Sequence, residues 1–248
     1  MRRFGLIGKD ISYSFSPGYF SAKFESLGLK ECSYEIFDLP EISGFSEILS
    51  QPDLCGLNVT IPYKTAICSF MDRLDPDAAE IGAVNTIRFT RKGLVGYNTD
   101  VIGFTRSLSP MLYPEDTAAL ILGTGGASKA VAYGLTKLGI RFRFVSRSAK
   151  DGALGYADLN QTILNDYQLI INCTPCGTYP RVDEAPPIPY DALNTTHLLY
   201  DLIYNPEKTA FLKKGSKAGC RVKNGLEMLH LQAEASWEIW NTEPTDLP

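Results

Sequence analysis

The sequence predicts an α/β protein of two units, in each of which helices cover a mixed or mostly parallel sheet. Three observations lead to this prediction. Short apolar runs alternate with helical segments over the first hundred residues, the alternation begins again near Ala118, and a glycine-rich turn follows at 123–128. Such alternation is typical of parallel strands joined by helices. We place the boundary between the units near residues 100–105.

The first unit is expected to contain alternating strands and helices followed by a hairpin. Two apolar segments, 86–89 and 94–97, flank Arg91-Lys92-Gly93, which favours a β-hairpin. Pro62 is typical of a first helical turn, so a helix is expected after it. Further strands are expected at 4–7, 34–37 and 54–60, and helices at 19–27 and 42–49.

The second unit is expected to contain five strands and three helices. The strands centre near Leu120, Phe144, Ile170, Tyr200 and Arg221, and the helices span about 129–138, 209–217 and 226–240. The spacing of apolar residues in the last helix predicts one buried face. That face would consist of Leu226, Leu229, Ala233, Trp237 and Trp240.

The glycine-rich turn matches part of a dinucleotide-binding pattern. Gly123 and Gly125 take the first two glycine positions of G-x-G-x-x-G, and Ser128 stands at the third. An apolar strand leads into the turn and a helix leaves it, so backbone N–H groups and the positive end of the helix dipole would face a pyrophosphate. A tight turn without a ligand remains the alternative interpretation.

The end of the next strand bears on the cofactor. Ser146 and Arg147 stand there, and no acidic residue follows before Asp151. An NAD site usually places an acid here to bind the ribose 2′-hydroxyl, whereas a guanidinium group fits a 2′-phosphate. The pattern therefore favours NADP over NAD, with a solvated surface arginine as the alternative.

Composition argues against several classes of protein. The net charge is −4 and no basic run appears, so nucleic-acid binding is not expected. No apolar stretch approaches the length of a membrane span, and the first one is too short for a signal peptide, so we expect a cytoplasmic protein without membrane association. The six cysteines are scattered, and the C-x-x-C at 173–176 lacks a second pair, so neither a disulfide framework nor a metal site is expected.

Two polar clusters in the first unit could carry chemistry. Pro17 favours an extended Ser16, which would make the hydroxyls of Ser14 and Ser16 face the same way and donate to a carboxylate; an ordinary turn and helix cap is the alternative. Asn58 and Thr60 share a face at a strand end, and Lys64 falls in the first turn of the expected helix. The helix dipole would there favour the neutral amine needed for proton transfer, with a solvated lysine as the alternative.

Two further clusters lie close to the hairpin. Asn85 precedes it within Gly82-Ala83-Val84-Asn85-Thr86, and Asn98-Thr99-Asp100 opens a helix after it. Helix capping alone would explain the second cluster.

Taken together, the motifs closely resemble the shikimate dehydrogenase family. Seven motifs appear in the family's order and span nearly the whole chain. They are S-x-S-P at 14–17, N-V-T-I-P-Y-K at 58–64, G-A-V-N-T at 82–86, N-T-D at 98–100, G-x-G-G-A-S at 123–128, D-x-x-Y-N-P-x-x-T-x-F-L at 201–212 and N-G-L-x-M-L-x-x-Q-A at 224–233.

The resemblance implies reversible NADPH-dependent reduction of 3-dehydroshikimate to shikimate, in chorismate and aromatic amino-acid biosynthesis. It implies a substrate-binding domain of residues 1–101, completed by a C-terminal helix at 225–248. Residues 102–224 would form a Rossmann-like NADP-binding domain, with a cleft between the two. The partners would be small molecules, and the protein a monomer or homodimer.

The resemblance also assigns residues to roles. Lys64 and Asp100 would form the catalytic pair. The substrate would be held by Ser14, Ser16, Asn58, Thr60, Asn85, Tyr204 and Gln232. The cofactor would be held by Gly123, Gly125, Gly126, Ala127, Ser146, Arg147, Thr174 and Gly225, and no metal is implied.

Some features depart from the family pattern. Ser146 stands where the family has Asn, and the chain after Lys150 leaves little room for the helix usually found there. Two alternatives follow: a quinate or dual-specificity dehydrogenase using NAD, and a non-catalytic dinucleotide-binding relative. The presence of both Lys64 and Asp100 argues against the second.

Overall fold

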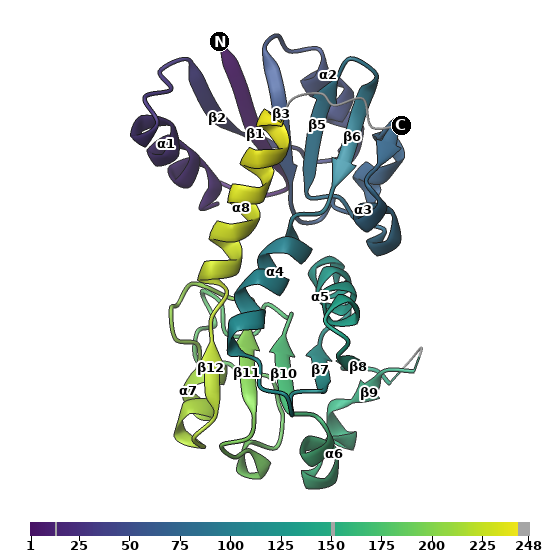
Figure 1. The fold of residues 1–248 in the computed structure, drawn as a ribbon, viewed down its shortest axis with the longest axis vertical. Helices are drawn as coiled ribbons and strands as arrows, with labels where there is room; N and C mark the ends of the chain where they lie inside the picture. The colour runs from purple at the N-terminus through teal and green to yellow at the C-terminus, as the bar shows by residue number, and fades with distance from the viewer. Residues whose placement is uncertain (13, 150–151, 243–248) are drawn as a thin grey trace. The chain divides into compact units, whose positions relative to one another are not determined.

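The computed structural model describes residues 1–12, 14–149 and 152–242 and confirms the predicted α/β class. Two compact units divide the chain: Met1–Thr99 with the chain from Ala233 onward, and Asp100–Gln232. Each unit has its own six-stranded sheet (Figure 1). No helix within the described residues is both long and apolar enough to cross a membrane.

The sheet of the first unit is mixed and has the order β2-β1-β3-β5-β6-β4. β1 pairs in parallel with β2 and β3, whereas β5 runs antiparallel to both β3 and β6, which confirms the expected hairpin. The strands are β1 (Arg2–Gly8), β2 (Cys32–Asp38), β3 (Leu54–Val59), β4 (Arg73–Leu74), β5 (Thr86–Thr90) and β6 (Gly93–Tyr97).

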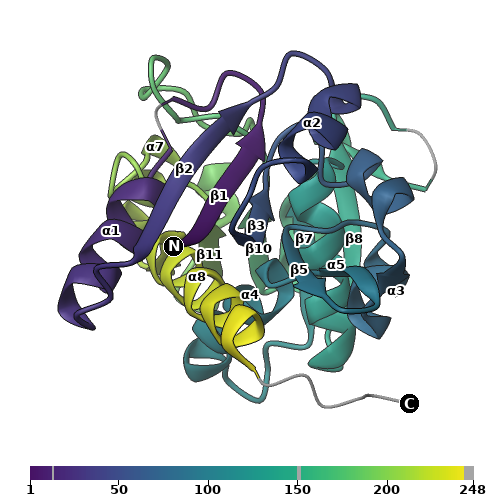
Figure 2. The ribbon, with the colours of Figure 1, turned by 90° about the horizontal axis from the view of Figure 1, so that it is seen from above.

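Helices cover both faces of this sheet. Side chains alternate along β1, so this strand has apolar residues on each face for helices to pack against. Phe4 and Leu6 of β1 pack in one apolar cluster with Phe20 and Trp240, while Ile7 packs in another with Phe45. Figure 2 shows α1 and α8 beside β1 and β2. The helical segments of this unit are α1 (Ser16–Ser26), η1 (Ile42–Gly44), α2 (Phe45–Leu49), η2 (Ala66–Phe70), α3 (Pro76–Ile81) and the C-terminal part of α8 (Leu226–Asn241).

Polar contacts fasten α8 to the rest of the first unit. Glu234 accepts hydrogen bonds from Lys23 Nζ at 2.6 and 2.8 Å and from the Tyr19 hydroxyl. The Trp240 indole donates to the Ile87 carbonyl at 3.0 Å, and its ring lies where a side chain on Gly56 would stand. The part of α8 from Ala233 onward therefore belongs to the core of the unit formed by the first hundred residues.

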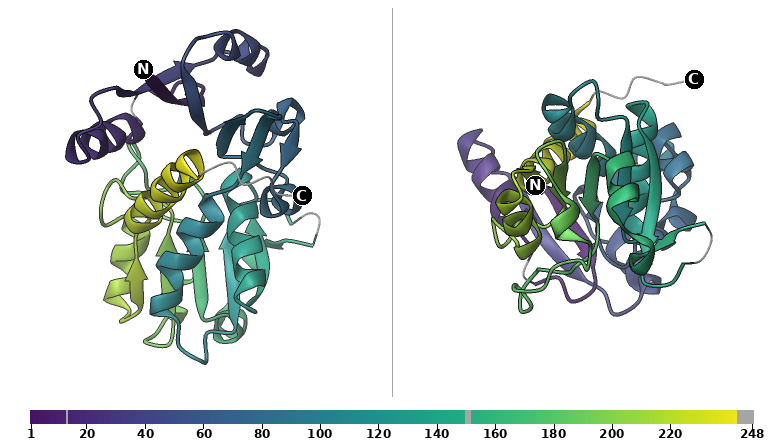
Figure 3. Two further views of the ribbon diagram at one scale, coloured as in Figure 1. Left: turned by 45° about the horizontal axis from the view of Figure 1, so that its top comes forward. Right: turned by 90° about the horizontal axis from the view of Figure 1, so that it is seen from below.

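The sheet of the second unit is entirely parallel and has the order β12-β11-β10-β7-β8-β9. All five residues of β7 are buried, as expected for a strand covered on both faces. Leu120 and Leu122 face one apolar cluster, and Ala119 and Ile121 face the other. Figure 3 shows the ribbon from two further directions. The strands are β7 (Ala118–Leu122), β8 (Arg141–Ser146), β9 (Leu154–Gly155), β10 (Leu169–Asn172), β11 (Leu198–Asp201) and β12 (Arg221–Lys223).

The helices of the second unit largely follow the expected ranges. The expected helix at 209–217 is confirmed, with Thr209 as its N-cap: the hydroxyl accepts a hydrogen bond from Leu212 N at 3.3 Å. The helical segments are α4 (Asp100–Leu108), η3 (Ser109–Met111), α5 (Gly126–Lys137), η4 (Tyr156–Asp158), α6 (Gln161–Asp166), η5 (Tyr190–Ala192), α7 (Ala210–Lys217) and the first part of α8.

The helix expected after Pro62 is wrong. Residues 61–65 form turns, and only a five-residue 3₁₀ segment, η2, follows. The Lys64 carbonyl accepts from Val84 N at 2.7 Å, so a bond to a distant residue replaces one that a helix would make. Lys64 therefore does not lie in a helical first turn, and the dipole argument for it does not apply.

Two smaller expectations also change, and a third is confirmed. The helix expected at 42–49 is divided into η1 and α2. Leu226 is 36% exposed, so it is not part of the buried face of α8. After β8 the described residues pass to the short strand β9 without a helix, as the crowded sequence there predicted.

We predict that Arg221→Met lowers the free energy of unfolding by about 3 kcal/mol, because it leaves a buried carboxylate without its cation. Arg221 makes two hydrogen bonds to Asp116, at 2.8 and 2.9 Å, and the Asp116 side chain is almost fully buried. Urea denaturation measures the change.

Arg181→Met is the matched control, since Arg181 and Glu184 form an exposed pair at 3.4 Å. Its cost should stay below about 1 kcal/mol. Equal losses in the two variants would contradict the prediction.

Candidate functional site

The two predicted serines meet at the N-terminus of α1. Phe15 has helical dihedral angles (φ −67°, ψ −30°) and Pro17 occupies the first turn, so the extended segment expected at Ser16 is wrong. The hydroxyl oxygens of Ser14 and Ser16 are nevertheless 3.5 Å apart, and Ser16 N donates to Ser14 Oγ at 3.3 Å. Paired hydroxyls at the positive end of an 11-residue helix favour an anionic group.

A buried polar network occupies the core of the first unit. It consists of Asn58 on β3, Asn85 and Thr86 at the start of β5, Thr99, and Ser236 on α8. Ser236 Oγ lies 2.8 Å from Thr86 Oγ1 and 3.2 Å from Thr99 Oγ1. The two predicted asparagines are thereby brought into one hydrogen-bonded cluster, together with Thr86, Thr99 and Ser236, none of which was predicted as a site residue.

Each asparagine amide in the polar network is held at both ends. Asn58 Oδ1 accepts from the Tyr34 hydroxyl at 2.8 Å, and its Nδ2 donates to Ser236 Oγ at 2.9 Å. Asn85 Nδ2 donates to Thr99 Oγ1 at 3.0 Å, and its Oδ1 accepts from Thr99 N at 2.6 Å. Both amides therefore have a defined orientation.

The remaining predicted polar residues near this network are Thr60, Lys64 and Asp100. Thr60 follows β3 directly and donates its N–H to the Ile7 carbonyl at 2.8 Å. Lys64 is half-buried in the turn, with its backbone fixed to Val84. Asp100 begins α4 immediately after Thr99 and is only 7% exposed, so the polar network fixes the chain just ahead of this carboxylate.

The glycine-rich turn joins β7 to α5 in the geometry that a pyrophosphate needs. Gly123 has φ +103°, which favours glycine, and an added Cβ there would stand 3.0 Å from Thr174 Cγ2. Added Cβ atoms at Gly125 and Gly126 would meet open space. Among the described residues, no side chain caps the start of α5, whose second residue is the half-buried Ala127. The first backbone N–H groups of this helix therefore fit a phosphate ligand.

A second polar cluster supports the loop opposite this turn. Asn172 at the end of β10 accepts from Thr174 N at 3.0 Å and from Thr174 Oγ1 at 2.6 Å. Its Nδ2 donates to Asp201 Oδ1 at 3.0 Å, and Thr209 Oγ1 donates to Asp201 Oδ2 at 2.6 Å. Asp201 therefore holds Thr174 in place through Asn172. The sequence analysis assigned Asp201 no role, although it is the first residue of the motif at 201–212.

The end of β8 agrees with the expected cofactor preference. Arg147 is exposed, and the described residues from Arg141 to Ala149 include no acid. Burial raises the pKa of the nearby Tyr156 to about 12, and the charge of Arg147 acts in the opposite direction. Ser146 Oγ donates to the Ser148 carbonyl, which shapes the turn that presents Arg147. A guanidinium group here fits a ribose 2′-phosphate.

The last predicted residues lie around the start of α8 in the second unit. Gly225 N donates to the Ile203 carbonyl at 3.1 Å, and any side chain at this position would collide with the Leu202 carbonyl. Tyr204 and Gln232 are half-buried, and Gln232 Nε2 donates to the Leu229 carbonyl at 2.8 Å. Within the described part of the chain, no three His, Cys, Asp or Glu residues gather as metal ligands would.

We predict that Asp201 makes stability depend on pH. Burial raises its pKa to about 6, from an ordinary value of 3.8. The folded state then binds the proton more tightly than the unfolded chain, so the free energy of unfolding falls as pH rises from about 4 to about 6 and levels off above. Asp201→Asn removes this contribution.

Urea denaturation at a series of pH values checks the prediction. The difference in unfolding free energy between the Asp201→Asn variant and the wild type should change between about pH 4 and pH 6 and stay constant from about pH 7 to pH 8. Parallel curves over the whole range would show that the carboxyl group does not titrate abnormally.

Comparison with known proteins agrees with this geometry. Residues 6–87 match the family described as the shikimate dehydrogenase substrate binding domain. The shikimate dehydrogenase (NADP(+)) of Methanopyrus kandleri is 38% identical over 261 residues, covering 96% of this chain and 90% of the relative.

Solved structures give the same result. The shikimate dehydrogenase of Aquifex aeolicus superposes with a TM-score of 0.87 at 32% identity, covering all of this chain and 94% of the other. The Thermus thermophilus shikimate 5-dehydrogenase, solved in complex with NADP(H) and shikimate, has a TM-score of 0.85 at 31% identity and covers 97% and 94%. On its sequence, its two sheets and its near full-length relatives, this chain belongs to the shikimate dehydrogenase family.

Proposed function

We propose that the protein is an NADP-dependent shikimate dehydrogenase, which reversibly reduces 3-dehydroshikimate to shikimate. The carrying observation is the polar network of the first unit, which orients Asn58 and Asn85 and leads directly to Asp100. Relatives of this size and similarity bear the same name and cofactor. The reaction makes the protein an oxidoreductase acting on a CH–OH group and places it in aromatic amino-acid biosynthesis.

The substrate carries one carboxylate and several ring hydroxyls, and the first unit offers groups for both. Ser14 and Ser16 donate to the carboxylate, aided by the N-terminus of α1. Ring oxygens are held by Asn58, Thr60, Asn85, Tyr204 and Gln232. Neutral amides and hydroxyls can both donate and accept, which suits a ligand whose oxygens do the same.

The residues at 123–127, 146–147, 174 and 225 hold the cofactor. The open backbone at Gly125 and Gly126 and the start of α5 fit the pyrophosphate, and Arg147 fits the 2′-phosphate. NADPH, when bound, supplies the hydride that adds to the ketone carbon. The positive φ of Gly123 lets the turn pass close to Thr174.

The protein's own contribution to the chemical step is a proton. As hydride arrives at the carbonyl carbon, negative charge develops on its oxygen, and Lys64 stabilises that charge and delivers the proton. Asp100 orients the lysine and accepts a hydrogen bond from the same alcohol. In the reverse direction Lys64 takes the proton from shikimate.

We also propose which part of the chain binds which ligand: residues 1–101 with 225–248 bind substrate, and residues 102–224 bind NADP. We propose further that the protein is cytoplasmic and that it is a monomer or homodimer.

A quinate dehydrogenase using NAD is the alternative function, and Arg147 disfavours it. Assaying shikimate and quinate, each with NADP⁺ and NAD⁺, separates the two by the absorbance of the reduced nicotinamide.

We predict that Lys64→Ala lowers kcat by a factor of about 10² to 10⁴ while the KM for shikimate stays within about threefold, because the amine acts on charge that develops during the reaction. Steady-state kinetics of shikimate oxidation measure both constants. Lys30→Ala, which removes an exposed lysine of the same unit, serves as the control and should keep wild-type kinetics. Near-native turnover in the Lys64→Ala variant would remove Lys64 from the mechanism.

We predict that Arg147→Leu raises the KM for NADP⁺ by about tenfold or more and leaves the KM for NAD⁺ nearly unchanged, since the charge-assisted bond to the 2′-phosphate is lost. Arg143→Leu is the matched control, because Arg143 is an exposed arginine on β8, the strand that ends directly before Arg147. A parallel rise for both cofactors would argue against a 2′-phosphate contact.

A further inference from the structure

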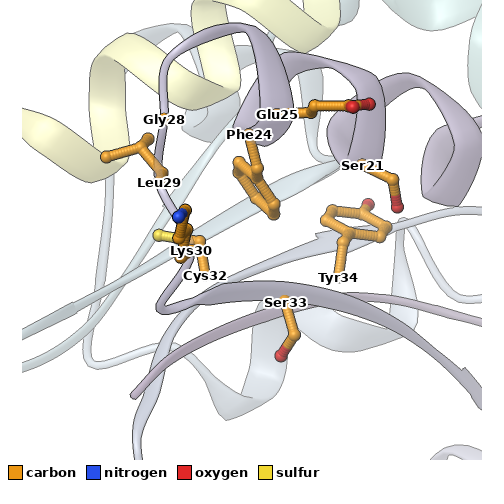
Figure 4. Close-up of a pocket in the computed structure, with 9 residues that line it drawn as sticks. All are labelled: Ser21, Phe24, Glu25, Gly28, Leu29, Lys30, Cys32, Ser33 and Tyr34. Atoms are coloured by element: carbon orange, nitrogen blue, oxygen red, sulfur yellow. The ribbon is translucent and has the colours of Figure 1, made fainter.

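Tyr34 lies in β2 with its ring fixed between the strand and α1. The side chain is buried, and its ring stacks on Phe20 with a centroid distance of 4.5 Å and an interplanar angle of 11°. The ring also lines a pocket of about 460 Å³ formed by α1, β2 and the loop between them (Figure 4). None of the residues lining this pocket was predicted to bind substrate or cofactor.

The hydroxyl of Tyr34, by contrast, bonds to a residue of the proposed substrate site. It donates to Asn58 Oδ1 at 2.8 Å. Burial raises the pKa of this phenol far above its ordinary value, so it keeps its proton and remains a donor at neutral pH. The single proton of this hydroxyl is therefore given to the Asn58 amide.

Other buried tyrosines of this chain bond elsewhere. The hydroxyl of Tyr200 pairs with Ser107 at 2.7 Å, and that of Tyr63 donates to the Leu39 carbonyl at 2.7 Å. These bonds join structural elements and include no residue with a proposed role in binding. The Tyr34 hydroxyl differs from these because its partner, Asn58, has such a role.

We infer that Tyr34 is a positioning residue for the substrate, whose hydroxyl fixes the amide of Asn58, which binds a ring hydroxyl. The inference rests on the proposed function. Because the ring is held by Phe20, the hydroxyl is a rigidly placed donor to this amide. It also keeps Asn58 Oδ1 on its own side, so that Nδ2 is directed to Ser236 and Thr86.

Removing the hydroxyl should weaken recognition of the substrate and spare the chemical step. In Tyr34→Phe the ring and its stacking remain, and Asn58 loses the donor that fixes its amide. We expect the KM for shikimate to rise about tenfold. kcat should stay within about twofold, and so should the KM for NADP⁺, because the cofactor residues belong to other elements.

Tyr200→Phe is the matched control. It also removes a buried hydroxyl bonded to a polar side chain, but Ser107 has no proposed role in binding. Both variants should lose similar thermal stability without ligand, whereas only Tyr34→Phe should raise the KM for shikimate. Kinetics are measured at a temperature at which circular dichroism shows each variant fully folded.

A double-mutant cycle tests whether Tyr34 acts through Asn58. If it does, the increases in KM caused by Tyr34→Phe and Asn58→Ala are less than multiplicative when the two are combined. Multiplicative effects, an unchanged KM in Tyr34→Phe, or an equal rise in Tyr200→Phe would overturn the inference while leaving the enzyme assignment intact. A wild-type protein inactive on shikimate with NADP⁺ would overturn the proposed function, and this inference with it.

Discussion

The structure of the first unit depends on satisfying the polar groups buried in its core. Asn58, Thr86, Thr99 and Ser236 are shielded from water, and each would be costly to bury without partners. Their bonds join positions 150 and 178 residues apart in the chain, Thr86 and Asn58 each to Ser236. The sheet and the last helix can therefore pack in only one register, and that register is the one that orients the site amides.

In the second unit, buried polar groups are satisfied around a carboxylate. Asp201 is fully buried and accepts from Asn172, Thr209 and Ile203 N. Three donors offset part of the cost of burying the charge, yet burial still dominates and raises its pKa. The polar network of the first unit consists of amides and hydroxyls, which do not titrate. In the second unit, by contrast, Thr174 is held through Asn172 by Asp201, whose carboxyl group does titrate.

The sequence predicts most clearly what local patterns determine. The apolar runs of β7, β10 and β11 identify strands buried on both faces, and the hairpin of β5 and β6 follows from its turn residues. The turn at 61–65 could not be predicted, because the bond from Val84 N to the Lys64 carbonyl that replaces helical pairing comes from a distant residue. Likewise, Ser14 and Ser16 meet in a helical start rather than in the expected extended segment.

The same distinction applies to the site. Asn58, Asn85 and the glycine turn stand within motifs, so the sequence indicates them. Tyr34, Ser236 and Asp201 act on these residues across the fold, and a tyrosine in a half-buried strand looks in the sequence like any core residue. Residues that position others are therefore recognised only when their hydrogen bonds are known.

The orientation of Asn58 shows why such bonds matter for recognition. Its Nδ2 has acceptors at Ser236 Oγ, Thr86 Oγ1 and the Asn85 carbonyl, all within 3.2 Å, so its two hydrogens are already shared inside the protein. Its Oδ1 has two lone pairs, and Tyr34 uses one of them. The amide can therefore offer an acceptor to a ligand more readily than a donor. A ligand hydroxyl at Asn58 would then donate its proton, because reversing the amide would leave Ser236 and Thr86 without their donor. The polar network therefore sets the hydrogen-bond polarity that Asn58 offers.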